Sequence, residues 1–269
     1  MADLAAFTLH LRFTHTDEVP AWLGRAAQAA FLDSLQTINP AAAARVHDGS
    51  GLKAFTASNL STGRWGGLVT LRPRAHYSMR FTTLFSDLTA LSLNALTAAW
   101  LRHGLTLHDQ PTMVEAVDTA ATSYADLLAN AAPARQITLR FASPTQFKLT
   151  HPHDKSNGIP MPLPVPERVF GSLIDRWERF SGVPLRPDLR EWVRLNVSVA
   201  AHRIETRTVE ARRAGHGAYT GFVGDVTFAL LRRDDVFVRQ VNALAAYAPF
   251  AGVGIRTTNG MGQVEWVQP

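Results

Sequence analysis

Four glycines and one arginine near the C-terminal end have types and spacing suited to binding phosphate. The glycines stand in two pairs on either side of the arginine: Gly252, Gly254, Arg256, Gly260 and Gly262. Glycine lets the backbone approach a ligand closely and turn its N–H groups outward. Arginine adds a permanent cation that can bind phosphate through two parallel hydrogen bonds. The stretch 252–262 therefore predicts a loop that holds phosphate groups.

This loop does not match the common nucleotide-binding loops. A Walker loop needs G-x-x-x-x-G-K-[ST], and no lysine follows these glycines. A dinucleotide-binding fingerprint needs a further helix and strand, about 30 residues in all, whereas the sequence ends seven residues after Gly262. The alternative without a ligand is a close crossing of two backbones or a bulged turn, which a single G-x-G favours more strongly than this doubled pattern does.

The strands and helices that must position the loop occur in the same order in both halves of the sequence. In the first half, apolar alternation predicts strands and apolar spacing of three to four residues predicts helices. The resulting order is strand 4–14, helix 20–38, short strands within 55–82, helix 84–103 and strand 105–118. A linker at 120–134, with a short helix at 123–131, precedes the second half. Its order is strand 135–141, a proline-rich loop 150–166, helix 167–181, strands 192–207 and 219–232, helix 234–247 and strand 263–267.

Both halves therefore have the order β-α-β-β-α-β. We predict an α+β fold of two tandem ferredoxin-like (RRM-like) domains, an N-terminal one over 1–122 and a C-terminal one over 135–269.

Composition favours a folded protein that binds an acidic partner. The chain has 269 residues, of which 46% are hydrophobic and 18% charged, with a net charge of +5. Arginine outnumbers lysine by 24 to 3, which suits nucleic acid, although a GC-rich genome has the same effect. The absence of cysteine excludes disulfides and thiolate chemistry, and with the lack of a signal peptide or an apolar span it predicts a cytoplasmic protein away from membranes.

Four stretches together resemble one family. The glycine-rich loop is similar to the signature of RAMP proteins of CRISPR systems, above all the stand-alone endoribonuclease that matures guide RNAs. Three more stretches match that family in the same chain order. They are His47–Ser58 (H-D-G-S-G-L-K-A-F-T-A-S), Ser143–Phe147 (S-P-T-Q-F) and Gly221–Val226 (G-F-V-G-D-V). The resemblance independently implies two tandem ferredoxin-like domains.

The resemblance also implies a chemistry. The family cleaves CRISPR repeat RNA without a metal or other cofactor. The 2′-OH attacks the neighbouring phosphate and leaves a 2′,3′-cyclic phosphate and a 5′-OH end. Its implied partners are repeat RNA and other CRISPR-associated proteins of an interference complex, with the chain a monomer or a homodimer.

Two residues match the family's catalytic positions. His47 is the candidate for proton transfer, in a loop expected to be glycine-rich, and Lys53 for stabilising the charged transition state. Some members also carry a tyrosine in the first helix, whereas residues 20–38 contain none. Either two residues suffice, or Arg25 or Ser34 helps, or cleavage is slow.

Arginines on the predicted 192–232 hairpin are the best candidates for holding RNA: Arg203, Arg207, Arg212 and Arg213. Glu205 and Glu210 lie among them, so an ordinary salt-bridged strand face is equally open. Two further arginine groups are weaker candidates: Arg64, Arg72, Arg74 and Arg80, and Arg168, Arg176 and Arg179.

Other functions have less support. His151-Pro152-His153-Asp154 could suggest a metal, but zinc needs three or four ligands in a defined geometry, so we predict no metal site. A general RRM protein needs an RNP aromatic motif that this sequence lacks. The remaining rival is a catalytically silent subunit that binds repeat RNA.

Overall fold

The computed structural model of the chain describes residues 2–48, 51–151, 154–210 and 218–267. These residues form two compact units. Unit 1 contains the described residues up to 123 together with residue 210 and residues 258–260. Unit 2 contains residues 124–209, 218–257 and 261–267 as far as they are described. Each unit is built around its own antiparallel sheet.

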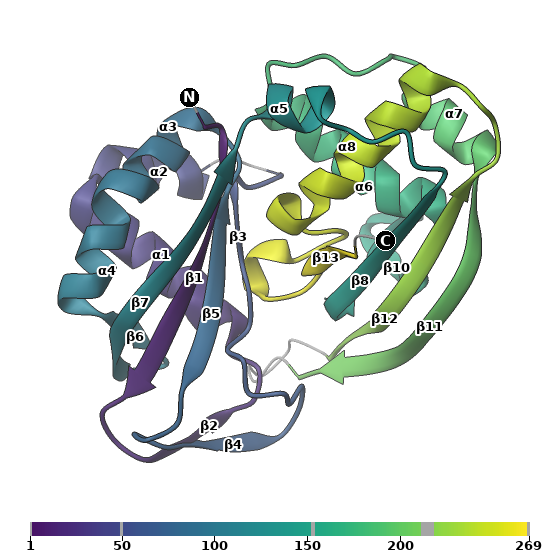
Figure 1. Ribbon diagram of the computed structural model, residues 1–269. Coiled ribbons are helices and arrows are strands. Elements are labelled where there is room, and N and C mark those ends of the chain that lie inside the picture. Colours follow the sequence, from purple (N-terminus) through teal and green to yellow (C-terminus); the bar gives the residue numbers. More distant parts are fainter. Residues whose placement is uncertain (1, 49–50, 152–153, 211–217, 268–269) are drawn as a thin grey trace. The chain divides into compact units, whose positions relative to one another are not determined.

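Unit 1 follows the β-α-β-β-α-β order with additions (Figure 1). Its principal elements are β1 (Leu4–Phe13), α1 (Gly24–Ile38), β3 (Phe55–Ala57), β5 (Tyr77–Thr83), the helical stretch α3 (Ser86–Leu91), η1 (Ser92–Leu96) and α4 (Thr97–His103), and β7 (Gln110–Thr122). The additions are α2 (Pro40–Asp48), the paired strands β2 (Asp17–Pro20) and β4 (Leu68–Leu71), and β6 (Leu105–Leu107). The sheet order β3-β5-β1-β7-β6 places the four principal strands in the order 2-3-1-4, as a ferredoxin-like fold requires.

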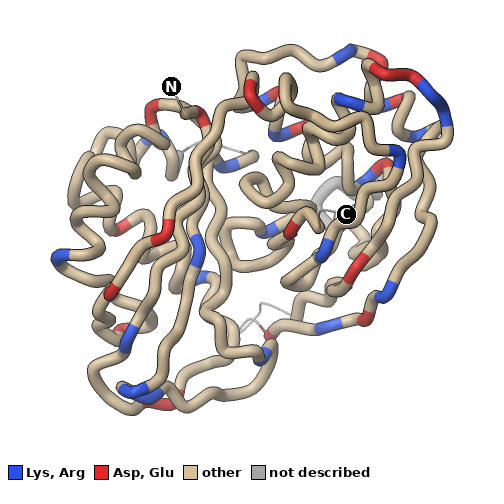
Figure 2. Tube along the Cα trace, viewed as in Figure 1, with Lys and Arg blue, Asp and Glu red and all other residues tan. Residues whose placement is uncertain are grey.

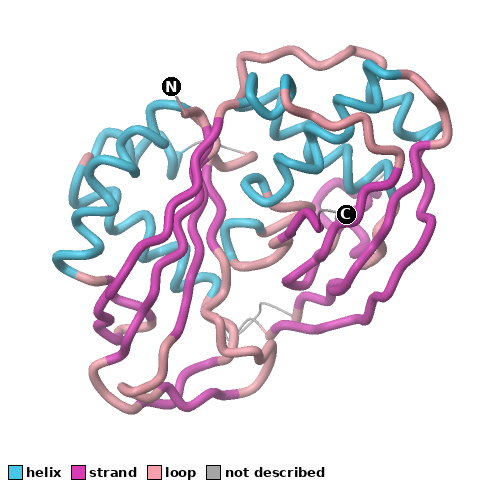
Figure 3. Tube along the Cα trace, viewed as in Figure 1, coloured by secondary structure: helices cyan, strands magenta, loops and turns pink. Residues whose placement is uncertain are grey.

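Aromatic side chains fill the interior of unit 1. From Phe7 to Phe13 of β1 the buried residues alternate with partly exposed ones, so one face of the sheet is apolar there. Figure 3 shows the helices of this unit gathered on one side of its sheet. Phe31 of α1 stacks on Phe55 of β3, with ring centroids 4.5 Å apart, and Trp100 of α4 packs against Phe7 and Phe81.

Unit 2 repeats the same order. Its elements are α5 (Tyr124–Ala129), β8 (Gln136–Thr145), β9 (Phe147–His151), β10 (Asp154–Met161), α6 (Pro166–Phe180), α7 (Leu189–Asn196), β11 (Val197–Val209), β12 (Tyr219–Leu230), α8 (Asp235–Ala251) and β13 (Val264–Val267). The sheet order β11-β12-β8-β13 is again 2-3-1-4. The predicted α+β architecture with two tandem ferredoxin-like folds is confirmed.

The helices of unit 2 begin where local chemistry allows. Pro166 opens α6 at a position whose backbone N–H would have no helical partner. The carboxylate of Asp234 caps α8 by accepting from the N–H groups of Val236 and Phe237. Trp177 of α6 packs edge-on against Tyr247 of α8, with centroids 5.4 Å apart.

The structure corrects several predicted boundaries. Helix α1 begins at Gly24 rather than at residue 20, because Pro20 ends β2. Residues 192–196, predicted as strand, belong to α7, whose buried Leu189, Trp192, Val193 and Asn196 have helical spacing. The proline-rich stretch 150–166 was predicted as a loop but contains β10. Within the described residues, no helix is long and apolar enough to cross a membrane.

Candidate active site and nucleic-acid interface

The glycine-rich loop begins at the end of α8 and folds back on itself. Gly252 ends the helix with a φ of 64°, a conformation that glycine adopts without strain. The N–H of Val253 donates to the carbonyl of Gly262 at 2.8 Å. A Cβ on Gly262 would lie 2.1 Å from the Val253 carbonyl oxygen. The first and last glycines are therefore needed where the two ends of the loop meet.

The loop packs against the S-P-T-Q-F segment (Ser143–Phe147) at the end of β8 and forms hydrogen bonds with it. The N–H of Gly262 donates to the Pro144 carbonyl at 3.1 Å, and the N–H of Ile255 donates to the Gln146 carbonyl at 3.0 Å. A Cβ on Gly254 would lie 2.4 Å from that same Gln146 oxygen. The third motif, G-F-V-G-D-V, lies beside the segment, because Gly221 of β12 has room for no more than a hydrogen where it meets the 144–145 backbone. The three motifs of unit 2 thus form one assembly.

These contacts revise the prediction of an outward-facing N–H cradle. The N–H groups of Val253, Gly254, Ile255 and Gly262 all donate to acceptors inside unit 2. For these four residues the prediction is wrong, because the backbone donors hold the loop together. The glycines therefore shape the loop on either side of Arg256.

Arg256 occupies the turn between the two glycine pairs. Its φ of 58° lies in the left-handed region, which is uncommon for a residue with a side chain. Its guanidinium carbon lies 3.9 Å from the centroid of the Tyr219 ring, and the residue is partly exposed. Stacking on an aromatic face leaves the edge of a guanidinium available for hydrogen bonds in its own plane.

Arg176 lies buried next to this turn and was wrongly grouped with surface candidates. It is 5% exposed, and burial lowers the pKa of its guanidinium below the ordinary value. The sequence spacing could have predicted this burial, because Arg176 stands three residues after Leu173 and seven after Val169 on the apolar face of α6. Arg168 and Arg179 of the same helix are exposed.

Residues 258–260 of the loop, which include the end of the 3₁₀ turn η2 (Thr257–Asn259), pack within unit 1. The Asn259 side chain donates to the Gln28 side chain of α1 at 2.5 Å. A Cβ on Gly24 would collide with the Asn259 carbonyl at 1.8 Å, so glycine at the start of α1 is required by this packing. Gly260, with φ 87°, forms a bridge with Ser58 after β3.

The two candidate catalytic residues are neighbours in unit 1. His47 is exposed in the last turn of α2, which corrects its predicted place in a glycine-rich loop. The helix forms because Pro40 opens it and the Asn39 side chain accepts from the Ala42 N–H at 2.9 Å. The partly buried Lys53 donates through Nζ to the His47 carbonyl oxygen at 2.6 Å.

The residues of α1 and of the segment just before it differ in whether their side chains are available for catalysis. Phe31 is fully buried, and Trp22 packs on Trp65 at 5.9 Å between ring centroids. The Ser34 hydroxyl donates to the Ala30 carbonyl and accepts from the Trp100 indole. Ser34 therefore has a structural role, and Arg25 is the exposed candidate.

The predicted basic patch lies partly on β11, the edge strand of the unit 2 sheet. Arg203 and Arg207 are exposed, and Arg207 pairs with Glu205 at 2.6 Å. Figure 2 shows basic and acidic positions alternating along this strand. Arg212 and Arg213 lie outside the described residues. The described half of the patch is thus a mixed face in which one cation is neutralised.

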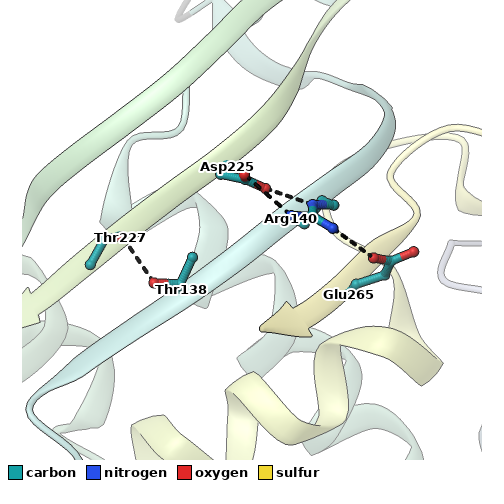
Figure 4. Close-up of polar contacts among 5 residues, drawn as sticks. All are labelled: Thr138, Arg140, Asp225, Thr227 and Glu265. Carbon is teal, nitrogen blue, oxygen red and sulfur yellow. Dashed lines mark hydrogen bonds and ion pairs between the residues drawn. The ribbon is translucent and has the colours of Figure 1, made fainter. Parts of the chain in front are cut away.

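Charged residues missed in the sequence lie in one row across the same sheet. Arg140 of β8 pairs with Asp225 of β12 at 2.8 Å and with Glu265 of β13 at 3.9 Å (Figure 4). Arg203 stands opposite Asp225 in the strand register. The hydrogen bond to Asp225 raises the pKa of Arg140. The sequence alone does not predict this row of charges, because the row depends on pairing between distant strands.

Metal ligands do not gather in the part of the chain that the structure describes. Within it, no three His, Asp or Glu side chains lie close enough to hold a metal ion. The motif at 151–154 falls partly outside the described residues, since Pro152 and His153 are not described.

Two ferredoxin-like units with a glycine-rich loop after the last helix define the class of RAMP proteins. Residues 139–264 match the family described as CRISPR-associated endoribonuclease Cas6. A Cas6 (TTHB231) product complex is 30% identical with a TM-score of 0.83, over 99% of this chain and 100% of that one. The chain therefore belongs to the Cas6 family of CRISPR-associated endoribonucleases.

Other solved structures agree. Thermus thermophilus Cas6 (TTHB231) is 27% identical with a TM-score of 0.71, over 99% of both chains. A Cas6 (TTHA0078) product complex is 28% identical with a TM-score of 0.74, over 98% of this chain and 99% of that one. A comparison with curated protein sequences gave no match.

Proposed function

We propose that this protein cuts CRISPR repeat RNA into guide RNAs without a metal ion. The 2′-oxygen attacks the neighbouring phosphorus, the bond from phosphorus to the 5′-oxygen breaks, and the products carry a 2′,3′-cyclic phosphate and a 5′-OH. Membership of the Cas6 family supports this reaction class. Relatives have been solved as product and substrate mimic complexes, which supports RNA as the ligand.

His47 is the proposed proton-transfer group. Its imidazole is exposed, so an RNA 2′-OH or 5′-oxygen can reach it. It takes the proton from the attacking 2′-OH or delivers one to the leaving 5′-oxygen, and solvent completes the exchange. A related Cas6 (TTHA0078) solved as a histidine-to-alanine mutant provides a precedent for testing a histidine.

Lys53 is the proposed electrostatic stabiliser, and its contact with His47 is the observation that carries this assignment. The Lys53 Nζ lies 2.6 Å from the His47 carbonyl oxygen, so a cation is held beside the residue proposed to move the proton. A fixed cation stabilises the charge that builds up on the phosphate in the transition state.

RNA binding is assigned to the second predicted domain. We assign proton transfer to residues 1–122 and backbone binding to residues 135–269. Arg256 of the glycine-rich loop is the proposed phosphate contact, with Arg203 and Arg207 of β11 as additional ones. Arg212 and Arg213 extend the proposed patch along the sequence.

The test is cleavage of the cognate repeat RNA in EDTA. A matched substrate carries a 2′-deoxy nucleotide immediately before the cut. Cleavage that persists in EDTA and disappears with the deoxy substrate is the expected result. Inhibition by EDTA that added Mg²⁺ reverses would overturn the metal-free mechanism.

The second candidate is a silent subunit that binds repeat RNA. It is favoured by α1, where Phe31 is buried and the Ser34 hydroxyl is engaged, so this helix does not supply a third acid–base group from those two residues. Tight binding of the repeat with no cleavage would establish it.

A further inference from the structure

The buried Arg176 contacts both sides of the turn that carries Arg256. Its Nη2 donates to the Gly254 carbonyl at 2.8 Å and to the Thr257 hydroxyl at 3.3 Å. Gly254 and Thr257 stand two residues before and one residue after Arg256. One guanidinium therefore joins the two ends of this turn.

Ser172, one helical turn earlier on α6, completes the contact. Its hydroxyl accepts from the Gly254 N–H at 2.9 Å and from Arg176 Nη1 at 2.8 Å. Arg176 Nη1 also donates to the Ser172 carbonyl at 3.0 Å. Gly254 is thus held at its N–H by Ser172 and at its carbonyl by Arg176.

The hydrogen-bond acceptors of Arg176 are neutral groups rather than carboxylates. The four acceptors of Arg176 are two carbonyls and two hydroxyls, all neutral. Burying a cation is costly unless hydrogen bonds satisfy it. An apolar side chain would fill the same place on α6 at lower cost, so burial alone does not explain an arginine at this position.

What the contacts do is hold a strained turn. Arg256 has a left-handed φ of 58°, and such a conformation persists only where the surroundings impose it. Its guanidinium then lies over the Tyr219 ring. We propose that Arg176 is a positioning residue for RNA binding, which fixes the 254–257 turn so that Arg256, stacked on Tyr219, presents its guanidinium edge to an RNA phosphate. This inference rests on the proposed function of the loop.

The test is a double-mutant cycle read by repeat-RNA affinity. Arg176→Met, Arg256→Met and the double variant are measured with an uncleavable repeat carrying the 2′-deoxy nucleotide. Loss of one charge-assisted contact weakens binding by about tenfold, and we expect this for each single variant. If Arg176 acts through Arg256, the double variant binds as Arg256→Met does.

Arg194→Met is the matched control. It removes an exposed arginine of α7 that pairs with Glu191, so it lowers the net charge equally without touching the turn. We expect near wild-type affinity. Wild-type affinity in Arg176→Met, or single losses that multiply to about a hundredfold in the double variant, would overturn the inference.

A second measurement reports the turn directly. We expect hydrogen exchange at the Gly254 and Ile255 amides to accelerate in Arg176→Met, while the Gly252 amide, bonded to Ala248 of α8, keeps its protection. Unchanged exchange at Gly254 would overturn the inference. If Arg176→Met does not fold, Ser172→Ala takes its place in the cycle. We expect Ser172→Ala alone to weaken RNA binding by a smaller factor, and to cause no further loss of affinity when it is combined with Arg256→Met.

Different results would overturn the proposed RNA binding and the positioning role of Arg176. Wild-type protein that does not bind repeat RNA overturns the proposed function and the RNA role of Arg176 with it. Wild-type protein that binds RNA, together with an Arg176→Met variant that binds equally well, overturns the positioning role alone.

Discussion

The Lys53 ammonium donates to the carbonyl oxygen of His47 at 2.6 Å and so closes the end of the helix that carries this histidine. Cations at a helix C-terminus satisfy its last carbonyls and interact favourably with the helix dipole. The same side chain therefore has a structural role in α2 and a proposed electrostatic role in cleavage. Separating these roles requires rate and stability to be measured on the same variants.

Replacing His47 should remove cleavage and leave binding intact. His47→Ala is expected to slow single-turnover cleavage of repeat RNA by about 10²–10⁴-fold, the usual contribution of a general acid or base, with unchanged RNA affinity. His103→Ala is the matched control, because His103 is also exposed in the last turn of a helix, α4. Equal cleavage rates in the two variants would remove His47 from the mechanism.

Lys53→Met tests the proposed stabilisation of the transition state. The expected result is a loss of about 10²-fold in the single-turnover rate, with a destabilisation of about 0.3–1 kcal/mol from the lost helix-end contact. Lys53→Arg keeps the cation and should recover part of both. A variant with lower thermal stability but a wild-type cleavage rate would leave Lys53 with the structural role alone.

Sequence periodicity was sufficient to predict the order of the principal strands and helices of both units. The alternation along Phe7, Leu9 and Leu11 marks a strand with one buried face. Helical spacing likewise marked α6 through Val169, Leu173 and Trp177, all of which are buried. Such patterns are local, so they can be read without knowing the partner of each strand.

Elements without a strong local pattern were missed. Residues 40–48 are rich in alanine and contain Ala42, Ala43 and Val46 as their buried apolar positions, a weak stripe that was predicted as loop. The helix depends on its Asn39 cap as well as on its packing against α1. Weak periodicity and a short length together hide such a helix.

The contacts made by the glycine-rich loop also could not be predicted from local sequence patterns. Its glycines were predicted to bring the backbone close to a ligand, whereas Gly254 lies close to the Gln146 carbonyl, about a hundred residues earlier, and Gly262 lies close to the Val253 carbonyl. A sequence shows that an N–H group exists, whereas a fold decides whether that group faces a ligand or a neighbouring carbonyl.

The loop should be intolerant of a single methyl group at its ends. Gly262→Ala places a Cβ 2.1 Å from the Val253 carbonyl oxygen at a φ of 68°, so a loss of more than about 1 kcal/mol is expected in denaturant unfolding. Gly182→Ala is the control, since a Cβ there meets no atom within 4 Å, and its effect should stay within about 0.5 kcal/mol. Similar stabilities for both variants would contradict the close packing of the loop ends.

Arg140 should contribute little to RNA binding despite its exposed position. Asp225 and Glu265 pair with it on either side (Figure 4), and a cation with two carboxylate neighbours attracts phosphate weakly. Arg140→Met is therefore expected to leave both the affinity for repeat RNA and its dependence on salt unchanged. Arg256→Met is the contrasting variant, because loss of a true phosphate contact makes the salt dependence shallower by about 0.7–0.9 in log–log slope. A shallower slope in Arg140→Met would instead show that RNA displaces the carboxylates and lies along this face of the unit 2 sheet.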